Sequence, residues 1–217
     1  MENNAKKSWD KIYKEGAGRL ECTFEIEEDL PRIIDFFKER GLRRILDLGC
    51  GAGRIAVYLA QKGFEVYGID ISEEGIRKAR QRLTEMDLHA NLKVYSMTDT
   101  LPYPDNFFDA VISTRTMHHA KIEQIRKIIE DIERILRPHG LIFISVRKSN
   151  LKKKISYVRK IAPRTFVNIE GEEKGVVHYI FNKNLLKREF RNFKIHDLWV
   201  DSKKYYCLLG ELKNKGR

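Results

Sequence analysis

Long apolar runs, a hydrophobic N-terminal segment and a regular cysteine pattern are all missing from this sequence of 217 residues. No apolar run approaches the ~20 residues that a membrane-spanning helix needs, so we expect neither a membrane span nor a membrane partner. The first residues lack the apolar core of a secretory signal. The three cysteines, Cys22, Cys50 and Cys207, fit neither a disulfide framework nor a zinc site by their number and spacing. These absences favour a cytoplasmic protein without a metal site.

The charge of the chain is unevenly distributed. The net charge is +11, yet residues 1–150 carry 25 basic and 24 acidic side chains, whereas residues 151–217 carry 17 and 7. A basic field of this kind attracts anionic partners. A lysine-rich, solvated surface typical of thermophile proteins explains the same composition, since 34% of the residues are charged. The hydrophobic fraction of 42% suffices for one buried core, so we expect a single domain over 1–217.

Apolar runs that suit buried strands alternate with longer segments of helical period. The expected strands are Arg44–Leu48, Glu65–Asp70, Leu92–Ser96, Phe108–Ser113 and Leu141–Val146. The expected helices between them are Arg54–Gln61, Glu73–Met86 and Ile122–Leu136. Continuous apolar strands that alternate with helices are typical of a parallel sheet covered on both faces.

Four parts follow from this pattern: an N-terminal lid, a core, a basic insertion or acceptor lid, and a C-terminal helix with a hairpin. They span residues 1–40, 41–147, 148–181 and 182–217. The basic insertion is weakly periodic, and we expect it to be partly helical over Leu151–Ile161. The last part predicts a helix over Asn182–Phe190 and two strands, Phe193–Val200 and Tyr205–Glu211. Strands this close along the chain predict an antiparallel hairpin at the edge of the sheet.

Three glycines at alternate positions follow the first expected strand. Gly49, Gly51 and Gly53 lie between the run that ends at Leu48 and the helix that begins at Arg54. Glycines at such a turn let a ligand approach the backbone, and the N–H groups of the helix start can bind an anion. The dinucleotide fingerprint would need glycine at 54, where this chain has arginine. The turn therefore predicts a nucleotide-type ligand and counts against a nicotinamide dinucleotide.

Three aspartates stand in or after the first three expected strands. Asp70 ends the second strand, where a carboxylate can accept hydrogen bonds from both hydroxyls of a ribose. Asp99 follows the third strand, where it could meet the amino edge of an adenine. Asp47 lies inside the first strand, just before the glycines, and both a ligand contact and a structural role in the turn fit it.

Three motifs together resemble a class I S-adenosylmethionine-dependent methyltransferase. They are Asp47-Leu48-Gly49-Cys50-Gly51-Ala52-Gly53, Gly68-Ile69-Asp70-Ile71-Ser72 and Leu101-Pro102-Tyr103-Pro104-Asp105-Asn106-Phe107-Phe108-Asp109. The C-terminal third is similar, more loosely, to small tellurite-resistance-type methyltransferases. The resemblance implies a Rossmann-like three-layer α/β sandwich, whose seven-stranded and mostly parallel sheet has its last strand antiparallel.

The resemblance also implies which residues bind S-adenosylmethionine. The implied contacts are Trp9, Tyr13, Arg19, Asp47, Gly49, Cys50, Gly51, Gly53, Asp70, Ile71, Thr98, Asp99 and Ser113. The glycines would cradle the methionine part, Asp70 would bind the ribose, and Thr98 with Asp99 would bind the adenine. Ser113, just past the fourth strand, would face the sulfonium. Cys50 suits packing in the turn better than reaction.

The N-terminal part would fold over the cofactor as a lid. Trp9 and Tyr13 would supply an aromatic contact. Arg19 is a candidate clamp for the methionine carboxylate, because a guanidinium binds a carboxylate in bidentate fashion. Arg54 competes for that role, and a surface position fits either arginine equally well.

Two adjacent histidines are the candidates for the chemistry. His118 and His119 follow the fourth strand, at the mouth of the sheet, where an imidazole could take a proton from a bound acceptor. Packing at the start of the next helix is the alternative for both. His178 and Tyr179 could place polar tips in an acceptor pocket, although an ordinary strand explains their alternation as well.

The sequence therefore predicts methyl transfer from S-adenosylmethionine to a small-molecule, possibly anionic, acceptor. An RNA of the tRNA type is the alternative acceptor, because five basic side chains would rim the acceptor entrance. They are Lys152, Lys153, Lys154, Arg159 and Lys160. A nicotinamide-dependent oxidoreductase and a non-catalytic RNA-binding module are the remaining alternatives.

Overall fold

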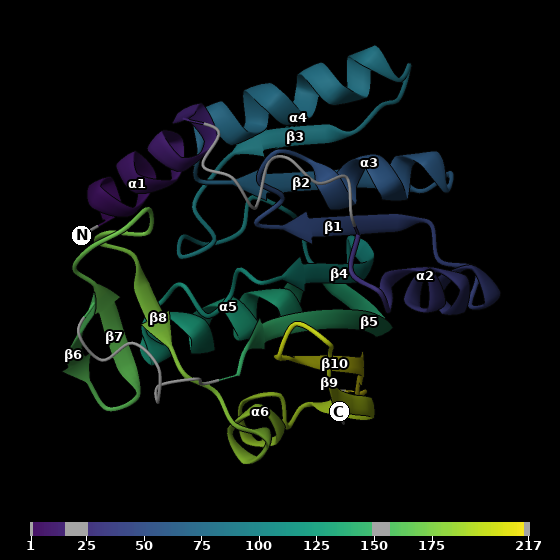
Figure 1. The fold of residues 1–217 in the computed structure, drawn as a ribbon. Helices are drawn as coiled ribbons and strands as arrows, with labels where there is room; N and C mark the ends of the chain where they lie inside the picture. Colours follow the sequence, from purple (N-terminus) through teal and green to yellow (C-terminus); the bar gives the residue numbers. More distant parts are fainter. Residues whose placement is uncertain (1, 16–25, 149–156, 215–217) are drawn as a thin grey trace.

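The computed structural model describes residues 2–15, 26–148 and 157–214, and Figure 1 shows how their elements are arranged. The main sheet has seven strands in the order β3-β2-β1-β4-β5-β10-β9. Their bounds are β1 Arg44–Leu48, β2 Glu65–Asp70, β3 Asn91–Val94, β4 Phe108–Thr114, β5 Leu136–Arg147, β9 Phe193–Val200 and β10 Tyr205–Leu212. The helices are α1 Glu2–Glu15, α2 Leu30–Glu39, α3 Arg54–Gln61, α4 Glu73–Glu85, α5 Ile122–Ile135 and α6 Lys183–Glu189.

The strand register confirms the expected, mostly parallel sheet. β1 pairs parallel with β2 and with β4, and β4 pairs parallel with β5. β10 is the reversed strand, because it pairs antiparallel with both β5 and β9. The C-terminal hairpin therefore closes one edge of the sheet, as the short connection between its strands predicts.

Helices cover both faces of the sheet, which makes the three expected layers. One face packs against α2, α3 and α4 around residues such as Phe37. The other face packs against α5 and α6 around residues such as Ile129. Because successive side chains of a strand point to opposite faces, Ile45 joins the first cluster and Leu46 the second.

Local sequence sets where two helices begin. The Ser72 hydroxyl accepts the backbone N–H of Gly75 at 3.0 Å and so caps α4. The Asn182 side chain caps α6 in the same way, through the N–H of Leu185 at 2.8 Å. Most element bounds lie within two residues of the expected ones. The exception in the main sheet is β5, which begins at Leu136, whereas the expected strand began at Leu141.

A second, three-stranded sheet stands where a partly helical insertion was expected. It consists of β6 Val158–Ala162, β7 Thr165–Asn168 and β8 Val177–Tyr179, paired antiparallel in that order. The helix expected over Leu151–Ile161 is wrong from residue 158 onward, and residues 151–156 lie outside the described chain. Pro163 and Arg164 separate β6 from β7, and Arg164 has a φ of 57°. Such a tight turn favours hairpin pairing, which satisfies the backbone groups that a helix would pair internally.

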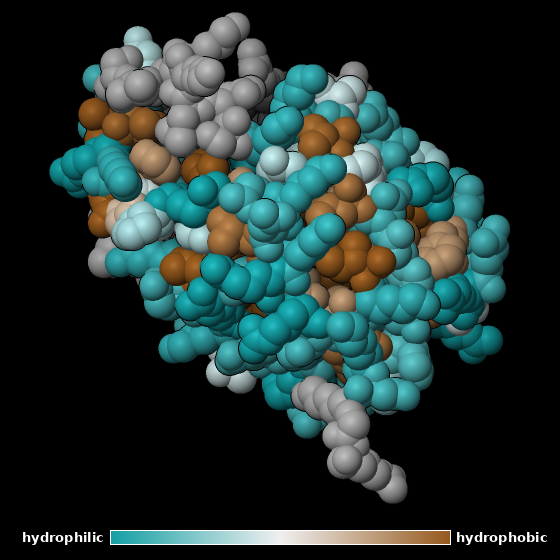
Figure 2. Space-filling model, turned by 90° about the horizontal axis from the view of Figure 1, so that it is seen from below, coloured by the Kyte–Doolittle hydropathy of each residue, from teal (hydrophilic) through white to brown (hydrophobic). Residues whose placement is uncertain are grey.

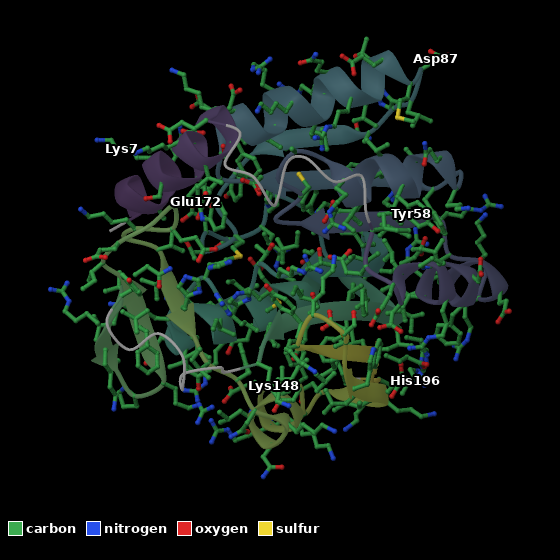
Figure 3. The ribbon with its side chains drawn as sticks, in the orientation of Figure 1. Lys7, Tyr58, Asp87, Lys148, Glu172 and His196 are labelled. Atoms are coloured by element: carbon green, nitrogen blue, oxygen red, sulfur yellow. The ribbon has the colours of Figure 1, made fainter. Side chains whose placement is uncertain are left out.

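The small sheet lies at the edge of the main sheet toward which the carboxyl ends of β1 and β4 point, and α1 lies beside it (Figure 1). The backbone N–H of Tyr179 donates to the carbonyl of His118 at 2.7 Å. The Ser8 hydroxyl donates to the carbonyl of Lys174 at 3.0 Å. Figure 3 places Glu172, in the loop before β8, next to α1. The N-terminal helix and the small sheet therefore meet at the carboxyl ends of the parallel strands.

The surface is mostly hydrophilic where Figure 2 shows it, and hydrophobic side chains lie scattered among the polar ones. Tyr157, Ile161 and Ile169, which belong to the small sheet or flank it, are among the exposed large hydrophobic side chains. Within the described ranges, no helix combines the length and the apolar character that crossing a membrane requires.

Candidate functional site

The glycine turn, Gly49 to Gly53, adopts backbone conformations that favour glycine. The φ angle is 79° at Gly49, 52° at Gly51 and 81° at Gly53, a region that residues with a Cβ atom rarely enter. The backbone N–H groups of Gly49 and Cys50 both donate to the carbonyl of Ile69 in β2, at 2.9 and 3.0 Å. The turn is thus tied to the end of β2 and lacks Cβ atoms at its glycines, as close approach of a ligand requires.

Two other segments pack closely on this turn. A Cβ atom at Gly49 would overlap the side chain of Thr116, which follows β4. A Cβ atom at Gly51 would overlap the hydroxyl of Tyr13, which belongs to α1. The segment after β4 and the N-terminal helix therefore converge on the glycine turn.

Asp70 lies directly beside the glycine turn. One carboxylate oxygen accepts the backbone N–H of Gly51 at 2.9 Å, and the other accepts that of Ser72 at 2.8 Å. Burial raises the pKa of Asp70 to about 6, although the two hydrogen bonds favour the ionised form. Each carboxylate oxygen can accept a further hydrogen bond. The site therefore has the capacity for the ribose contact, which stays a prediction.

Asp47 is enclosed by the protein. Its side chain is buried, the backbone N–H of Ala56 donates to it, and its Oδ2 has no hydrogen-bond partner among the described residues. Burial raises the pKa of Asp47 to about 8, although the nearby Arg54 guanidinium opposes this shift. Of the two roles that the sequence left open, this placement supports the structural role at the start of α3.

Thr98 and Asp99 follow β3, which pairs with the strand that ends in Asp70. Thr98 Oγ1 lies 2.8 Å from Ser96 Oγ, and the backbone N–H of Asp99 donates to the carbonyl of Ser96 at 3.2 Å. The Asp99 side chain is exposed, and Ile71 is half-buried. The adenine contact of Thr98 and Asp99, and the contact of Ile71 with the cofactor, stay predictions.

Ser113 does not occupy the position expected from the sequence. β4 continues to Thr114, so Ser113 lies inside the strand, where its fully buried hydroxyl donates to the carbonyl of Leu48 at 2.9 Å. It therefore joins β4 to β1. Cys50 is buried against Gly68, and burial raises the pKa of its thiol well above the usual range. This environment suits packing and not reaction.

The N-terminal helix α1 is fastened across the start of α4. The Asp10 carboxylate accepts the hydroxyl of Ser72 at 2.6 Å and the backbone N–H of Glu74 at 3.2 Å. The rings of Trp9 and Tyr13 lie 6.2 Å apart, and Tyr13 contacts the glycine turn. The helix therefore lies against the glycine turn, and its role as a lid over the cofactor stays a prediction.

The two candidate carboxylate clamps have different outcomes. Arg19 lies outside the described residues. Arg54 forms a bidentate ion pair with Glu27, at 2.7 and 2.8 Å, and Arg115 lies 3.6 Å from the same carboxylate. Burial alone would raise the pKa of Glu27, but the two arginines lower it. Arg54 is thus engaged by a buried carboxylate, which sequence reasoning missed because Glu27 lies in a segment without a motif.

Three histidines lie together at the mouth of the sheet. His118 and His119 follow β4, and β8 brings His178 against them, with ring centroids 4.7 Å apart between His119 and His178. Trp9 packs edge-on against His119 at 5.0 Å. We refer to His118, His119 and His178 as the histidine cluster. The sequence left open whether His178 and Tyr179 line an acceptor pocket or belong to an ordinary strand. His178 lies in a strand and joins the cluster, whereas Tyr179 packs in the core.

Burial decides the charge of this cluster. It lowers the pKa of His118 well below its usual range and that of His119 to about 3, and the neighbouring imidazoles add to the effect. Glu173, in the loop before β8, lies 3.1 Å from Nε2 of His178. Burial alone would raise the pKa of Glu173, but His178 and His119 lower it to about 2. The cluster thus combines the neutral imidazoles of His118 and His119 with an ionised carboxylate.

A cavity of about 390 Å³ opens near the ion pair of Glu27 and Arg115. It is lined by Ile26, Glu27, Glu28, Arg115, Asp201, Ser202 and Lys203. The segment before α2, the residue after β4 and the turn between β9 and β10 supply these side chains. A lining with charges of both signs suits a polar ligand.

Residues 45–140 match the family model of a methyltransferase domain. The methyltransferase YqeM of Bacillus subtilis is 34% identical over 125 residues, which cover 57% of this chain and 47% of that protein. This chain therefore spans about half the length of that curated relative.

Two solved structures share the fold over most of this chain. The 1,6-didemethyltoxoflavin-N1-methyltransferase of Burkholderia thailandensis, bound to 1,6-didemethyltoxoflavin and S-adenosylhomocysteine, has a TM-score of 0.72 at 17% identity. The similarity covers 96% of this chain and 87% of that one. TehB of Haemophilus influenzae has a TM-score of 0.66 at 19% identity, over 95% of this chain and 67% of that one. At such identities the likeness is one of fold.

Proposed function

This chain belongs to the class I methyltransferases, and from that premise we propose that it transfers the methyl group of S-adenosylmethionine to a small-molecule acceptor. The observation that carries the proposal is the hydrogen bond between the Gly51 N–H and the Asp70 carboxylate, at 2.9 Å. It joins two of the three sequence motifs in one site at the carboxyl edge of the sheet. In open α/β sheets, ligands bind at that edge.

The residues at this edge fit S-adenosylmethionine. The glycines of the turn have the backbone conformation that a close approach of the methionine part would need, and Thr116, Tyr13 and Ala79 pack where their Cβ atoms would lie. Asp70 has the acceptor capacity for the ribose hydroxyls, and Thr98 with Asp99 stands past β3 for the adenine. When bound, the cofactor supplies a methyl group activated by a sulfonium.

The chain's own contribution is to orient the acceptor and to exclude water. Such positioning accounts for much of the rate of a displacement reaction. α1 closes over the glycine turn through Asp10 and Tyr13. The small sheet meets α1 through the contact of Ser8 with Lys174. Neutral His118 and His119 can accept a proton from the acceptor, although the low pKa of each makes it a weak base.

Three features support a small acceptor. α1 and the small sheet meet at the carboxyl edge, which restricts access for a large substrate. The cavity beside Arg115, at about 390 Å³, has the size of a small-molecule pocket. The enzyme from Burkholderia thailandensis, which shares the fold, is named for a small-molecule substrate.

An acceptor screen tests this proposal. Cell extract is divided into small-molecule, RNA and protein fractions and incubated with the chain and S-adenosylmethionine labelled in its methyl group. We expect label in the small-molecule fraction, together with calorimetric binding of S-adenosylmethionine and none of NAD. Absence of cofactor binding would overturn the proposal. Label found in the RNA fraction alone would show that the acceptor is RNA and not a small molecule.

RNA is the second candidate acceptor, and one observation favours it. Residues 151–217 carry 17 basic and 7 acidic side chains. Arg159 and Lys160 of this part are exposed on β6. Lys152, Lys153 and Lys154, the other side chains expected at the entrance, lie outside the described residues.

A further inference from the structure

Three imidazoles converge in the histidine cluster from two distant parts of the chain. One ring nitrogen from each of His118, His119 and His178 lies within 4.8 Å of the others. The ring centroids of His118 and His119 are 4.1 Å apart, and those of His118 and His178 are 5.9 Å apart. The hydrogen bond from the Tyr179 N–H to the His118 carbonyl holds the two segments together at 2.7 Å.

The cluster contains polar atoms that nothing in the described part of the chain satisfies. The Nδ1 atoms of His118, His119 and His178, and the Nε2 atom of His178, are all buried and have no hydrogen-bond partner there. A buried polar atom without a partner costs about 1–3 kcal/mol. Buried polar atoms in native proteins are nearly all paired. Four such atoms in one place therefore indicate a ligand that accepts electron pairs or donates hydrogen bonds.

The chemistry of the rings favours an electron-pair acceptor. A neutral imidazole has one ring nitrogen with a lone pair, and transition-metal ions bind imidazole through such a nitrogen. Three imidazoles whose ring nitrogens converge in one place therefore suit a metal ion.

We propose that the histidine cluster binds one divalent transition-metal ion through His118, His119 and His178. Imidazole ligands suit zinc, cobalt, nickel and copper, whereas magnesium and calcium prefer oxygen. In a tetrahedral site with metal–nitrogen bonds of about 2.1 Å, the ligand atoms stand about 3.4 Å apart. Side-chain rotation must therefore shorten the widest separation, which lies within 4.8 Å before binding.

Glu173 is the positioning residue of this site. Its carboxylate lies 3.1 Å from Nε2 of His178 and accepts the Asn168 amide at 3.1 Å. A carboxylate that binds the second nitrogen of a ligating imidazole sets its tautomer and its orientation. Glu173 thus stands at the Nε2 side of His178, at ion-pair distance, and leaves the Nδ1 side to the metal; neither ring nitrogen of His178 has a hydrogen-bond partner among the described residues.

The site lies next to the glycine turn. Thr116, which packs against Gly49, belongs to the same segment as His118 and His119. Trp9 of α1 contacts His119, and its neighbour Tyr13 contacts Gly51. Three imidazoles leave one position of a tetrahedral ion open, as in catalytic zinc sites. An oxygen, nitrogen or sulfur atom of the methyl acceptor would fill this open position. That role of the metal rests on the proposed function, whereas binding of the metal does not.

Cobalt titration tests the site without any methyl transfer. The full chain, free of an affinity tag and treated with chelating resin, is titrated with Co²⁺ and followed by its visible absorption. We expect one ion per chain, with the strong bands of a four- or five-coordinate ion, and displacement by Zn²⁺ but not by Mg²⁺. Absence of stoichiometric binding, or displacement by Mg²⁺, would overturn the proposal.

Variants separate the cluster from other ligands. We expect His178→Ala to abolish the cobalt bands and Glu173→Gln to weaken binding by about 10- to 100-fold. His89→Ala, at an exposed histidine outside the cluster, should bind as wild type does. Unchanged affinity in the first two variants, each with a native circular dichroism spectrum, would place the metal elsewhere. If His178→Ala does not fold, Glu173→Gln carries the test. Calorimetry with S-adenosylmethionine on the same samples keeps this result separate from that of the proposed function.

Discussion

A buried carboxylate, that of Asp47, and a half-buried one, that of Asp70, flank the glycine turn, and backbone N–H groups hold both. Asp70 accepts those of Gly51 and Ser72, and Asp47 accepts that of Ala56. Burial raises the pKa of each, because the protein interior solvates a charge less well than water does. Side chains kept in such an unfavourable environment are candidates for a function in a site, or for organising its backbone.

The first prediction concerns Asp70. We expect Asp70→Ala to weaken binding of S-adenosylmethionine by about 1.5–3 kcal/mol, because charge-assisted hydrogen bonds to the ribose are lost. Isothermal titration calorimetry measures the change. Asp35→Ala, at an exposed position in α2, serves as the control. Equal affinities for the two variants, both folded by circular dichroism, would remove Asp70 from the cofactor site.

The second prediction concerns the pH dependence that Asp47 imposes. Its pKa is about 8 in the folded chain and about 3.8 as an isolated group, so between these values the folded state holds a proton that the unfolded state has lost. The free energy of unfolding therefore falls as pH rises through this window, by up to about 1.4 kcal/mol per pH unit. We expect a shallower dependence in Asp47→Asn.

Urea unfolding at several pH values between 6 and 8 measures this slope. Asp70, whose pKa is about 6, is present in both proteins, so the difference in slope between wild type and variant isolates Asp47. Asp35→Asn is the matched control at an exposed site. Parallel pH profiles for wild type and Asp47→Asn would show that the buried carboxylate does not titrate in this range.

The packing of α3 against α4 depends on a glycine at their contact. Gly53 has a φ of 81°, and a Cβ atom there would lie 2.6 Å from the Cβ of Ala79 in α4. Gly63, after α3, has a φ of 84° and no atom near the position of a Cβ. The two glycines thus share a backbone conformation and differ in their surroundings.

The third prediction uses this pair. We expect Gly63→Ala to destabilise the chain by about 1–2 kcal/mol, the cost of the left-handed conformation. Gly53→Ala should lose about 1–3 kcal/mol more, because it also overpacks the contact with Ala79. Urea unfolding gives both values. Equal losses would mean that the two helices move apart without cost.

The charge of the whole molecule bears on its acceptor. The last third carries most of the net charge of +11, and it forms the small sheet as well as the C-terminal hairpin. A field of this kind can steer a small anion or hold a polynucleotide. Binding to RNA depends far more steeply on salt than does one contact with a small anion, so salt separates the two.

The fourth prediction follows from a small acceptor. We expect no binding of tRNA-sized RNA at physiological salt. At low salt we expect the same RNA affinity for wild type and for Arg159→Ala/Lys160→Ala. Lys38→Ala/Lys127→Ala, which removes two exposed lysines from the core part, is the matched control. The contrary result is RNA binding whose logarithmic affinity falls with the logarithm of the salt concentration, with a slope of about −0.7 per neutralised phosphate. If that slope became shallower only in Arg159→Ala/Lys160→Ala, RNA would be favoured as the acceptor instead.

Short-range patterns in the chain were enough to predict the main sheet and its ligand edge. The apolar runs, the helical period of α5 and the cap at Ser72 are local, and each element forms largely from its own residues. The same holds for the glycine turn and for Asp70, whose places depend on a strand end and the helix after it. Parallel strands separated by helices then leave few possible topologies.

Contacts between distant segments settled the rest. Glu27 finds Arg54, β8 brings His178 to His118, and β6 pairs with β7 where a helix was expected. Each of these contacts depends on how complete helices and strands pack against one another. The spacing of residues along the chain does not indicate such contacts. The hydrophobic period of a strand or helix can be read from residues that are close together in the sequence. Which buried polar side chains meet is decided instead by the folded chain. Folding removes these side chains from water and pairs them with one another in the same step.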